Sequence, residues 1–239
     1  MARRRFYVEE VRNGEAELRG DDARHLTRVL RAEAGQQYEI SDGQAAYLAA
    51  VAEARGDCVL FRVVEPVSSP ELPVRLTLLA ALFKFDRFEW MIEKVTELGA
   101  DRIVPMETAR SEKGLFEASR KRAERWARIA HEAGQQSRRL RAPEILPAVR
   151  FEQALAEVAD WHYLLDEAGA PPLLRQIPAS LVPHGRVALL LGPEGGWTES
   201  ERQSATVAGW TPASLGPQVL RAETAGAAAV AILLNAWCV

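Results

Sequence analysis

The feature that most constrains the fold is a strand–helix–strand pattern that begins after Pro73. Residues 76–83 form a nearly continuous apolar run, which is typical of a strand covered on both faces. Residues 86–98 then place apolar side chains on one helical face, and Gly99 stands where a C-cap belongs. Because residues 102–106 form the next apolar run, the pattern predicts a βαβ unit within a parallel sheet.

The same alternation continues toward the C-terminus. It predicts helices over residues 117–136 and 151–158, strands at 161–165 and 187–191, and a helix that begins at Thr198. The last apolar run, residues 225–239, is shorter than the roughly 20 residues that span a bilayer. We therefore expect a buried or interface helix over residues 222–236 and no membrane partner. The predicted fold class is α/β.

The first part of the chain has a different pattern. Short apolar stretches are separated by turn pairs at Asn13-Gly14, Asp42-Gly43 and Gly56-Asp57, as in antiparallel hairpins. One helix is expected here, capped by Asp21 or Asp22, with Leu26, Val29 and Leu30 on its apolar face. Residues 65–73 are rich in Pro and Ser and predict a linker. We therefore predict a small β domain over residues 1–68 and an α/β domain over residues 74–239.

Composition limits the classes of function. Hydrophobic residues make up 48% of the 239, so the core can be large enough to need no disulfide. The two cysteines and four histidines lack the spacing of metal ligands, which predicts a reduced, cytoplasmic protein without a metal. The net charge of −3 does not indicate a nucleic-acid partner, but residues 119–141 hold eight Arg or Lys and two Glu. This stretch is either a phosphate-binding surface or a solvated helix face.

Residues 191–197, Leu-Gly-Pro-Glu-Gly-Gly-Trp, follow one predicted strand directly. Thr198 and Glu201 then form the pattern of a capping box, which marks a helix start. Glycines allow the backbone to approach a ligand, and ligands in open α/β sheets bind at such strand ends. The segment has neither the Walker ending nor the dinucleotide fingerprint. It is either a backbone-lined cradle for a neutral or zwitterionic group, or a tight turn without a ligand.

Residues 215–225 form a second glycine turn that leads into a helix. The helix is expected to begin at Glu223 or Thr224, where a glutamate suits the helix dipole. Arg221 and Glu223 could instead form only an exposed ion pair. The order of the two segments, both near the C-terminus, resembles the cofactor loops of the SPOUT methyltransferases.

More narrowly, the chain resembles the RsmE family, which methylates N3 of a uridine in 16S ribosomal RNA. The resemblance covers nearly the whole length, including Arg4-Arg5-Phe6-Tyr7, His25-Leu26, Val29-Leu30-Arg31, Lys84 through Arg87, Lys94, Glu97-Leu98-Gly99-Ala100, Ala109-Arg110-Ser111, Arg125-Trp126, Glu132-Ala133, Gln136-Ser137, Arg139 and Pro143-Glu144. Three residues depart from the family pattern, which has an arginine at Gln218, a threonine at Ala222 and a glutamate at Gln135. These departures leave the glycines of both loops in place and bear on the contacts to the target RNA.

The resemblance implies an architecture and a chemistry. The first domain would be a PUA-like β-barrel that binds RNA, and the second a SPOUT domain with a deep trefoil knot, an exception to the rule against knots. S-adenosylmethionine would be the cofactor, bound in the knot largely by backbone groups. The partners would be 16S ribosomal RNA or the assembled small ribosomal subunit, together with a second copy of the chain in a homodimer.

The resemblance also implies site residues. The expected cofactor-binding residues are Leu165, Leu191, Gly192, Glu194, Gly195, Gly196, Leu215, Gly216, Leu220, Thr224 and Ala225. The catalytic candidates are Arg139 and Arg221, which would stabilise a uridine anion, and Glu194 and Glu223, which could act as the base. The expected RNA-binding residues are Arg3, Arg4, Arg5, His25, Arg28, Arg31, Arg122, Arg138 and Arg139.

Alternatives to these assignments remain open. Glu223 could only cap its helix, Glu194 could only bind the amides of its own loop, and His25 could be a core or helix-surface histidine. An enzyme that modifies another RNA position would share the same loops. A catalytically silent RNA-binding protein would keep the basic stretch but would not need to bind the methyl donor.

Overall fold

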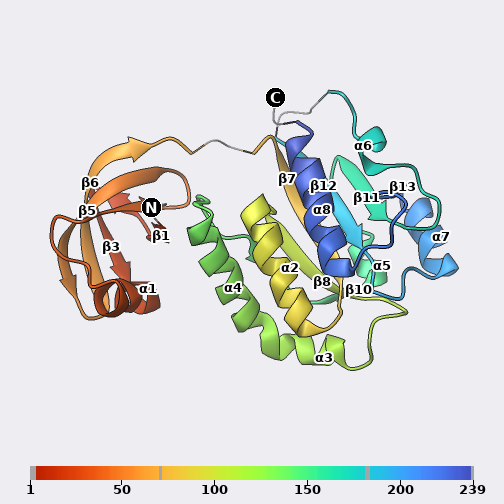
Figure 1. The fold of residues 1–239 in the computed structure, drawn as a ribbon, viewed down its shortest axis with the longest axis horizontal. Coiled ribbons are helices and arrows are strands. Elements are labelled where there is room, and N and C mark those ends of the chain that lie inside the picture. Colours follow the sequence, from red (N-terminus) through yellow and green to blue (C-terminus); the bar gives the residue numbers. More distant parts are fainter. Residues whose placement is uncertain (1–3, 70–71, 181–183, 238–239) are drawn as a thin grey trace. The chain divides into compact units, whose positions relative to one another are not determined.

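The computed structural model describes residues 4–69, 72–180 and 184–237. The chain forms two compact units, which are shown in Figure 1. Unit 1 consists of residues 1–71 together with His131–Ala142, and unit 2 contains the rest. The domain boundaries predicted from the sequence had placed residues 131–142 in the second domain. Among the described residues, no helix is both long and apolar enough to cross a membrane.

Unit 1 is built on a six-stranded mixed sheet, which confirms that the first part of the chain is rich in β-structure. Its strands are β1 (Arg5–Tyr7), β2 (Val11–Arg12), β3 (Glu15–Arg19), β4 (Gln37–Ser41), β5 (Ala46–Arg55) and β6 (Cys58–Val67), in the order β1-β4-β5-β6-β3-β2. Only β1 and β4 are parallel, and the turn pairs expected from the sequence join β2 to β3, β4 to β5 and β5 to β6. The core of the unit includes Phe6, Leu18, Leu26, Ile40 and Phe61.

Two sequence predictions in unit 1 were wrong. The expected helix is α1 (Gly20–Arg24) followed by a π-helical turn, η1 (His25–Val29), and its N-cap is Arg19 rather than an aspartate. Because a π-helix closes i→i+5 hydrogen bonds, it rotates the residues that follow. Leu26 is buried, whereas Val29 and Leu30 are 64% and 45% exposed. The linker is also shorter than expected, since β6 continues to Val67 and pairs there with Ala46.

Unit 2 contains a seven-stranded sheet in which every pair of neighbouring strands is parallel. Its strands are β7 (Val74–Ala81), β8 (Arg102–Glu107), β9 (Glu144–Ile145), β10 (Val149–Arg150), β11 (Trp161–Leu165), β12 (Gly185–Leu191) and β13 (Thr211–Ala213). The order is β10-β8-β7-β12-β11-β13, with β9 beside β8. The parallel sheet predicted from the strand–helix–strand pattern is therefore confirmed.

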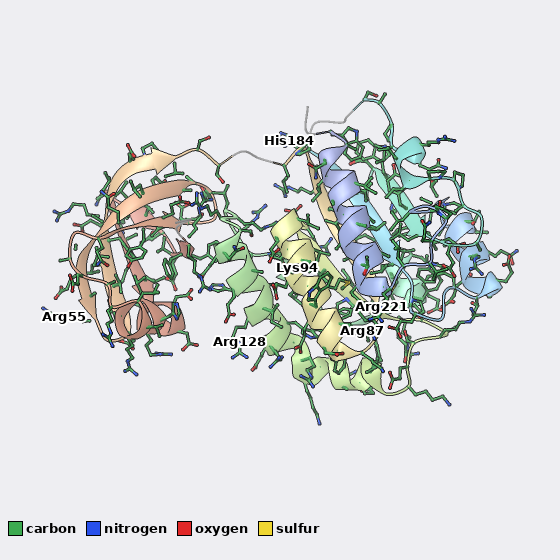
Figure 2. The ribbon with its side chains drawn as sticks, in the orientation of Figure 1. Arg55, Arg87, Lys94, Arg128, His184 and Arg221 are labelled. Carbon is green, nitrogen blue, oxygen red and sulfur yellow. The ribbon has the colours of Figure 1, made fainter. Side chains whose placement is uncertain are left out.

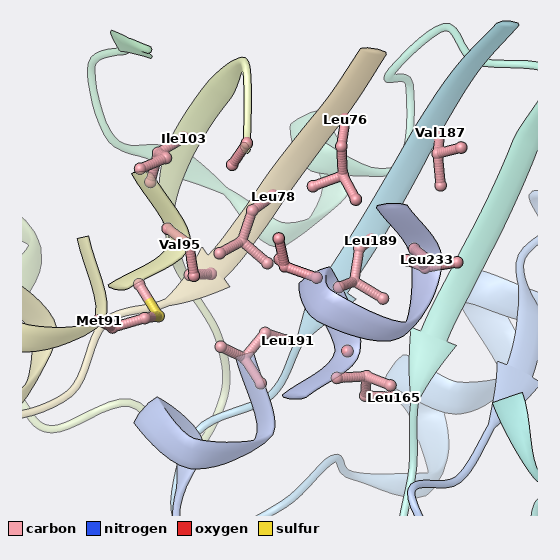
Figure 3. Close-up of a cluster of buried hydrophobic side chains, with 14 of the residues drawn as sticks. Leu76, Leu78, Met91, Val95, Ile103, Leu165, Val187, Leu189, Leu191 and Leu233 are labelled. Carbon is pink, nitrogen blue, oxygen red and sulfur yellow. The ribbon is translucent and has the colours of Figure 1, made fainter. Parts of the chain in front are cut away.

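Helices cover both faces of this sheet. On one face, α2 (Phe85–Leu98) and α8 (Ala222–Asn235) pack against strand residues, as Figure 3 shows for Met91 and Leu233 among Leu78, Leu189 and Leu191. The other face packs against α5 (Phe151–Ala154) and α7 (Glu199–Val207), with Trp197 and Trp210 in the core. Since the strands are buried on both sides, they read as continuous apolar runs in the sequence.

The long helix predicted over residues 117–136 is interrupted. The chain forms α3 (Leu115–Ser119), a 3₁₀ turn at Arg120–Arg122 and α4 (Ala123–Gln136). The Ser119 hydroxyl donates a hydrogen bond to the carbonyl oxygen of Phe116 at 2.6 Å, a local side-chain bond that competes with regular helix geometry. A further short helix, α6 (Leu173–Gln176), lies between β11 and β12 along the chain.

A polar cluster joins α1 to the last turns of α4 within unit 1. Asp22 Oδ2 lies 2.7 Å from His131 Nε2 and 2.6 Å from Gln135 Nε2, which donates to it. Burial by itself raises the pKa of Asp22, but the hydrogen bonds from His131 and Gln135 outweigh burial and hold the pKa below 3.8. The cluster therefore favours an ionised Asp22.

Replacing Asp22 with Asn should lower the free energy of unfolding at pH 7 by on the order of 1–2 kcal/mol, because a hydrogen-bonded carboxylate is lost. A depressed carboxyl pKa stabilises the fold above the unfolded value of 3.8, and the stabilisation disappears as the pH falls through the folded value. Urea unfolding from pH 7 to pH 3 should show the difference from wild type shrinking. Asp21→Asn is the matched control, since that side chain is 94% exposed. A difference that stays constant over this range would contradict the assignment.

Candidate active site

A cavity, partly open to solvent, lies at the carboxyl ends of β11, β12 and β13. These three strands are parallel neighbours in the sheet, so the loops that follow them meet at one edge. The lining comes from the ends of the three strands, the loops after them and the first turn of α8. The cavity therefore lies where ligands bind in open α/β sheets.

The structure brings most of the predicted cofactor residues together. Those that line the cavity are Leu165, Leu191, Gly192, Glu194, Gly196, Leu215, Gly216, Leu220 and Ala225. Gly195 and Thr224 are not in the lining: Gly195 packs against Arg110, and Thr224 is exposed on α8. Sequence reasoning missed the other lining residues, which are Asp166, Glu167, Pro193, Trp197, Ala213, Gln218, Val219 and Ala222. The strand-end rule could have found Asp166 and Glu167, since they directly follow β11.

Two glycines of the loop after β12 occupy positions where a side chain would be strained or would collide with a neighbour. Gly196 has a φ of 66°, and a Cβ there would lie 2.6 Å from Oε1 of Glu167. At Gly192 a Cβ would lie 3.0 Å from the indole ring of Trp197. Backbone atoms thus approach the cavity where a side chain would collide with its lining.

The side chain of Trp197 packs against this loop. Its side chain is fully buried, and Nε1 donates a 2.7 Å hydrogen bond to the carbonyl oxygen of Leu165 at the end of β11. The ring also packs against Phe151 with 5.5 Å between centroids. The loop after β12 is therefore anchored to the strand beside it.

The predicted capping box is confirmed at the start of α7. The amide of Glu201 donates to Thr198 Oγ1 at 3.2 Å, and the amide of Thr198 donates to Glu201 Oε2 at 2.8 Å. Oε1 of the same glutamate accepts from the amide of Ala109 at 2.8 Å. Glu201 thus secures both the end of the glycine loop and the segment after β8.

Two carboxylate–arginine groups border the cavity, and the first involves Asp166. Arg202 donates to its two oxygens at 2.7 and 3.1 Å. Burial alone raises the pKa of Asp166, but the bonds from Arg202 and from the amide of Ala168 outweigh it and lower the pKa. Asp166 is therefore an ionised acceptor in the cavity wall.

The second group joins Glu194 and Glu223 through Arg87. Arg87 Nη1 donates to Glu194 Oε1, and Nε lies 3.9 Å from Glu223 Oε1. Glu223 is 8% exposed, and among the described residues no group bonds to its buried Oε2. The sequence had placed Arg87 among the matched segments but not among the site residues.

The ion pair expected as an alternative for Glu223, with Arg221, does not form. Arg221 is the N-cap residue of α8 and is exposed, and its guanidinium makes no hydrogen bond or ion pair to the described part of the chain. Figure 2 labels Arg87 and Arg221 at the end of unit 2 where α2 and α8 begin. The fourth catalytic candidate, Arg139, belongs to unit 1, where its Nε donates to the carbonyl oxygen of Arg141 at 3.2 Å.

The predicted RNA-binding residues fall into different environments. Arg28 and Arg31 are exposed, and His25 and Arg4 are half-buried. Arg138 is exposed and lies 3.3 Å from Glu39, while Arg122 in unit 2 contacts Glu89 and the ring of Phe85. Arg3 lies outside the described residues.

Arg5 has a structural place that the sequence did not anticipate. It is 3% exposed, and its guanidinium donates to Glu39, to Ser69 and to the carbonyl oxygen of Arg138. A buried guanidinium with these partners holds β1 to β4 and to residues 131–142. We therefore leave Arg5 out of the proposed RNA surface.

No group of three His, Cys, Asp or Glu side chains within residues 4–69, 72–180 and 184–237 is arranged to hold a metal ion. The polar groups around the cavity are instead carboxylates, arginines and backbone atoms of glycine-rich loops. Such an arrangement suits an organic ligand with several hydrogen-bonding groups.

Comparison with known proteins gives a consistent result. Residues 70–234 match a family described as RNA methyltransferase domain. The chain is 32% identical to ribosomal RNA small subunit methyltransferase E of Bacillus subtilis, over 87% of this chain and 85% of the relative. It is 36% identical to the protein of the same name from Synechocystis, over 87% of this chain and 68% of that relative.

Solved structures extend the similarity to three dimensions. A ribosomal RNA small subunit methyltransferase E from Neisseria gonorrhoeae, bound to S-adenosyl methionine, aligns with a TM-score of 0.88 at 29% identity, over 99% of this chain and 98% of that one. A putative methyltransferase from Legionella pneumophila, in complex with the same cofactor, aligns with a TM-score of 0.87 at 29% identity and the same coverage.

Proposed function

Because the chain belongs to the ribosomal RNA small subunit methyltransferase E family, we propose that it transfers a methyl group from S-adenosylmethionine to N3 of a uridine in 16S ribosomal RNA. The observation that carries this proposal is the cavity at the ends of β11, β12 and β13, lined by both glycine loops. The relative from Neisseria gonorrhoeae, similar over nearly its full length, is bound to S-adenosyl methionine.

The residues of the cavity fit this cofactor. Leu165, Leu191 and Leu220 offer apolar surface, and the loops at Gly192 and Gly216 bring backbone amides and carbonyls to the wall. When bound, the cofactor supplies a methyl group that its sulfonium has already activated, so the protein's main task is to position the two reactants.

The residues of this chain would manage the proton and the charge. N3 of uridine carries a proton that must leave before or during attack on the methyl group. We assign Glu223 as the acceptor of that proton, because its Oε2 is buried and has no partner among the described residues. Glu194 would help to hold the cofactor loop, and Arg221 and Arg139 would stabilise the uridine anion.

The finer architecture belongs to the same proposal. Unit 1 would be a PUA-like barrel that binds RNA through Arg4, His25, Arg28 and Arg31, with Arg138 and Arg139 on its returning segment. Arg122 would add a contact from unit 2. The chain of unit 2 would form a deep trefoil knot, and the small residues of α8 would allow close packing in a homodimer. The enzyme would act in the cytoplasm on 16S ribosomal RNA or the assembled small subunit.

The test has two parts, titration with S-adenosylmethionine and methylation of 16S ribosomal RNA. We expect saturable binding of the donor and one added methyl group, mapped by mass spectrometry to N3 of a uridine in RNA from a strain that lacks this protein. Methylation at a different position would support the rival enzyme. Binding of RNA without any binding of the methyl donor would support a silent RNA-binding protein and overturn the proposal.

A further inference from the structure

Arg87 lies where two segments that are far apart in the sequence meet. It belongs to the first turn of α2, while Glu194 lies in the loop after β12 and Glu223 in the first turn of α8. Arg87 and Glu194 are separated by 107 positions along the chain, yet their side chains are hydrogen-bonded. Because Glu194 lines the cavity and Glu223 follows Ala222, which also lines it, Arg87 connects the two cofactor loops from outside the cavity.

The two carboxylates that share Arg87 have different degrees of burial. The Glu194 side chain is 45% exposed, whereas that of Glu223 is 11% exposed and that of Arg87 is 30% exposed. A carboxylate this buried requires a compensating charge, and Arg87 is the cation nearest to it in the ion pairs of the described chain. The other carboxylate oxygen of Glu223, Oε2, is buried without a partner, which costs free energy unless a ligand supplies a hydrogen-bond donor.

We propose that Arg87 is a positioning residue, which holds the loop of Glu194 against the start of α8 and fixes the side chain of Glu223 beside the cavity. The inference rests on the proposed function, since it deepens the role of Glu223 in that site. A guanidinium is suited to this task because its planar fork can serve two carboxylates at once. The ammonium group of lysine is a point charge, so it could serve one carboxylate well but not both in a fixed geometry.

Arg87→Gln and Arg87→Lys provide the test, with Arg186→Gln as a matched control at the opposite end of β12, where the side chain is exposed. For Arg87→Gln we expect kcat to fall by about 30-fold or more and the Kd for S-adenosylmethionine to rise by about tenfold, since misplacement of reacting groups affects the rate more than binding. Arg87→Lys should recover most of the affinity but less of kcat. The control should match wild type in both quantities.

A double-mutant cycle with Glu194→Gln separates positioning from a general loss of structure. If Arg87 acts through Glu194, Arg87→Gln should change the Kd for S-adenosylmethionine by less than about threefold when Glu194 is already Gln. Additive effects on Kd, or wild-type values of kcat and Kd for Arg87→Gln, would overturn the proposal. Should Arg87→Gln fail to fold, kcat of Arg87→Lys decides the matter, since a wild-type kcat for Arg87→Lys would overturn the proposal. Failure of the proposed function itself would appear separately, as a wild-type protein that does not bind the methyl donor.

Discussion

Glu223→Gln is expected to lower kcat for methyl transfer by about 100-fold or more, the usual range for loss of a general base. Glutamine has nearly the same shape as glutamate but cannot take the uridine N3 proton. Glu223 is favoured as the base because its Oε2 is unpaired among the described residues, while its Oε1 lies near Arg87. Glu194 is more exposed and is hydrogen-bonded to Arg87.

Single-turnover kinetics with saturating S-adenosylmethionine and 16S ribosomal RNA would measure this effect. The Kd for the donor should change by less than about threefold, because a change confined to the transition state lowers kcat without weakening ground-state binding. Glu152→Gln, an exposed glutamate in the first turn of α5, is the matched control and should keep wild-type kcat. If Glu223→Gln kept more than a third of wild-type kcat, Glu223 would be only a helix-capping residue.

Trp197→Ala is expected to lower the free energy of unfolding by about 3–5 kcal/mol, the usual cost of removing a fully buried tryptophan side chain. This is the largest loss of stability among the substitutions proposed. The substitution removes the ring that packs against Phe151 and leaves the carbonyl oxygen of Leu165 without its 2.7 Å hydrogen bond. Because the ring also lies against Gly192, its loss should release the loop after β12 and weaken donor binding.

Calorimetric unfolding and donor titration would measure both effects. Trp90→Ala is the control, since Trp90 is 44% exposed on α2 in the same unit and its loss should cost about 0.5 kcal/mol. Trp197→Phe keeps most of the ring volume and should recover much of the stability while still lacking the hydrogen bond. Equal losses for Trp197→Ala and Trp90→Ala would show that the ring does not anchor the loop.

The sequence predicted the long strands of unit 2 because the strands of a parallel sheet are buried on both faces; the short strands β9, β10 and β13 were missed, and α5 ends at Ala154 rather than at residue 158. The strand at Trp161–Leu165 has the predicted bounds, and the capping box at Thr198 and Glu201 has the predicted partners. Predictions were poorer in unit 1, where a π-helical turn rotated Val29 and Leu30 into solvent. Periodicity cannot anticipate that change, since it assumes regular α-helical geometry.

The candidate site was only partly predictable for a related reason. Glycine loops can be recognised from a short stretch of sequence, because the backbone conformation depends on the residues of the loop itself. Arg87 and Arg5 were assigned to no structural partner, since ion pairs between distant segments leave no local pattern. Only the fold brings Arg87 to Glu194 and Glu223, or Arg5 to Glu39.

The sequence by itself determined the α/β class, the strands β7, β8, β11 and β12 of unit 2, the two glycine loops and the family to which they belong; it did not predict β9, β10 or β13. The tertiary structure decided which strand ends meet, how the loops at Gly192 and Gly216 form one cavity, and which carboxylates share Arg87. The physical reason is the range of the forces involved. Burial patterns, caps and turns act over a few neighbouring residues, whereas the cavity depends on contacts between segments tens of residues apart and the Arg87–Glu194 pair joins residues 107 positions apart.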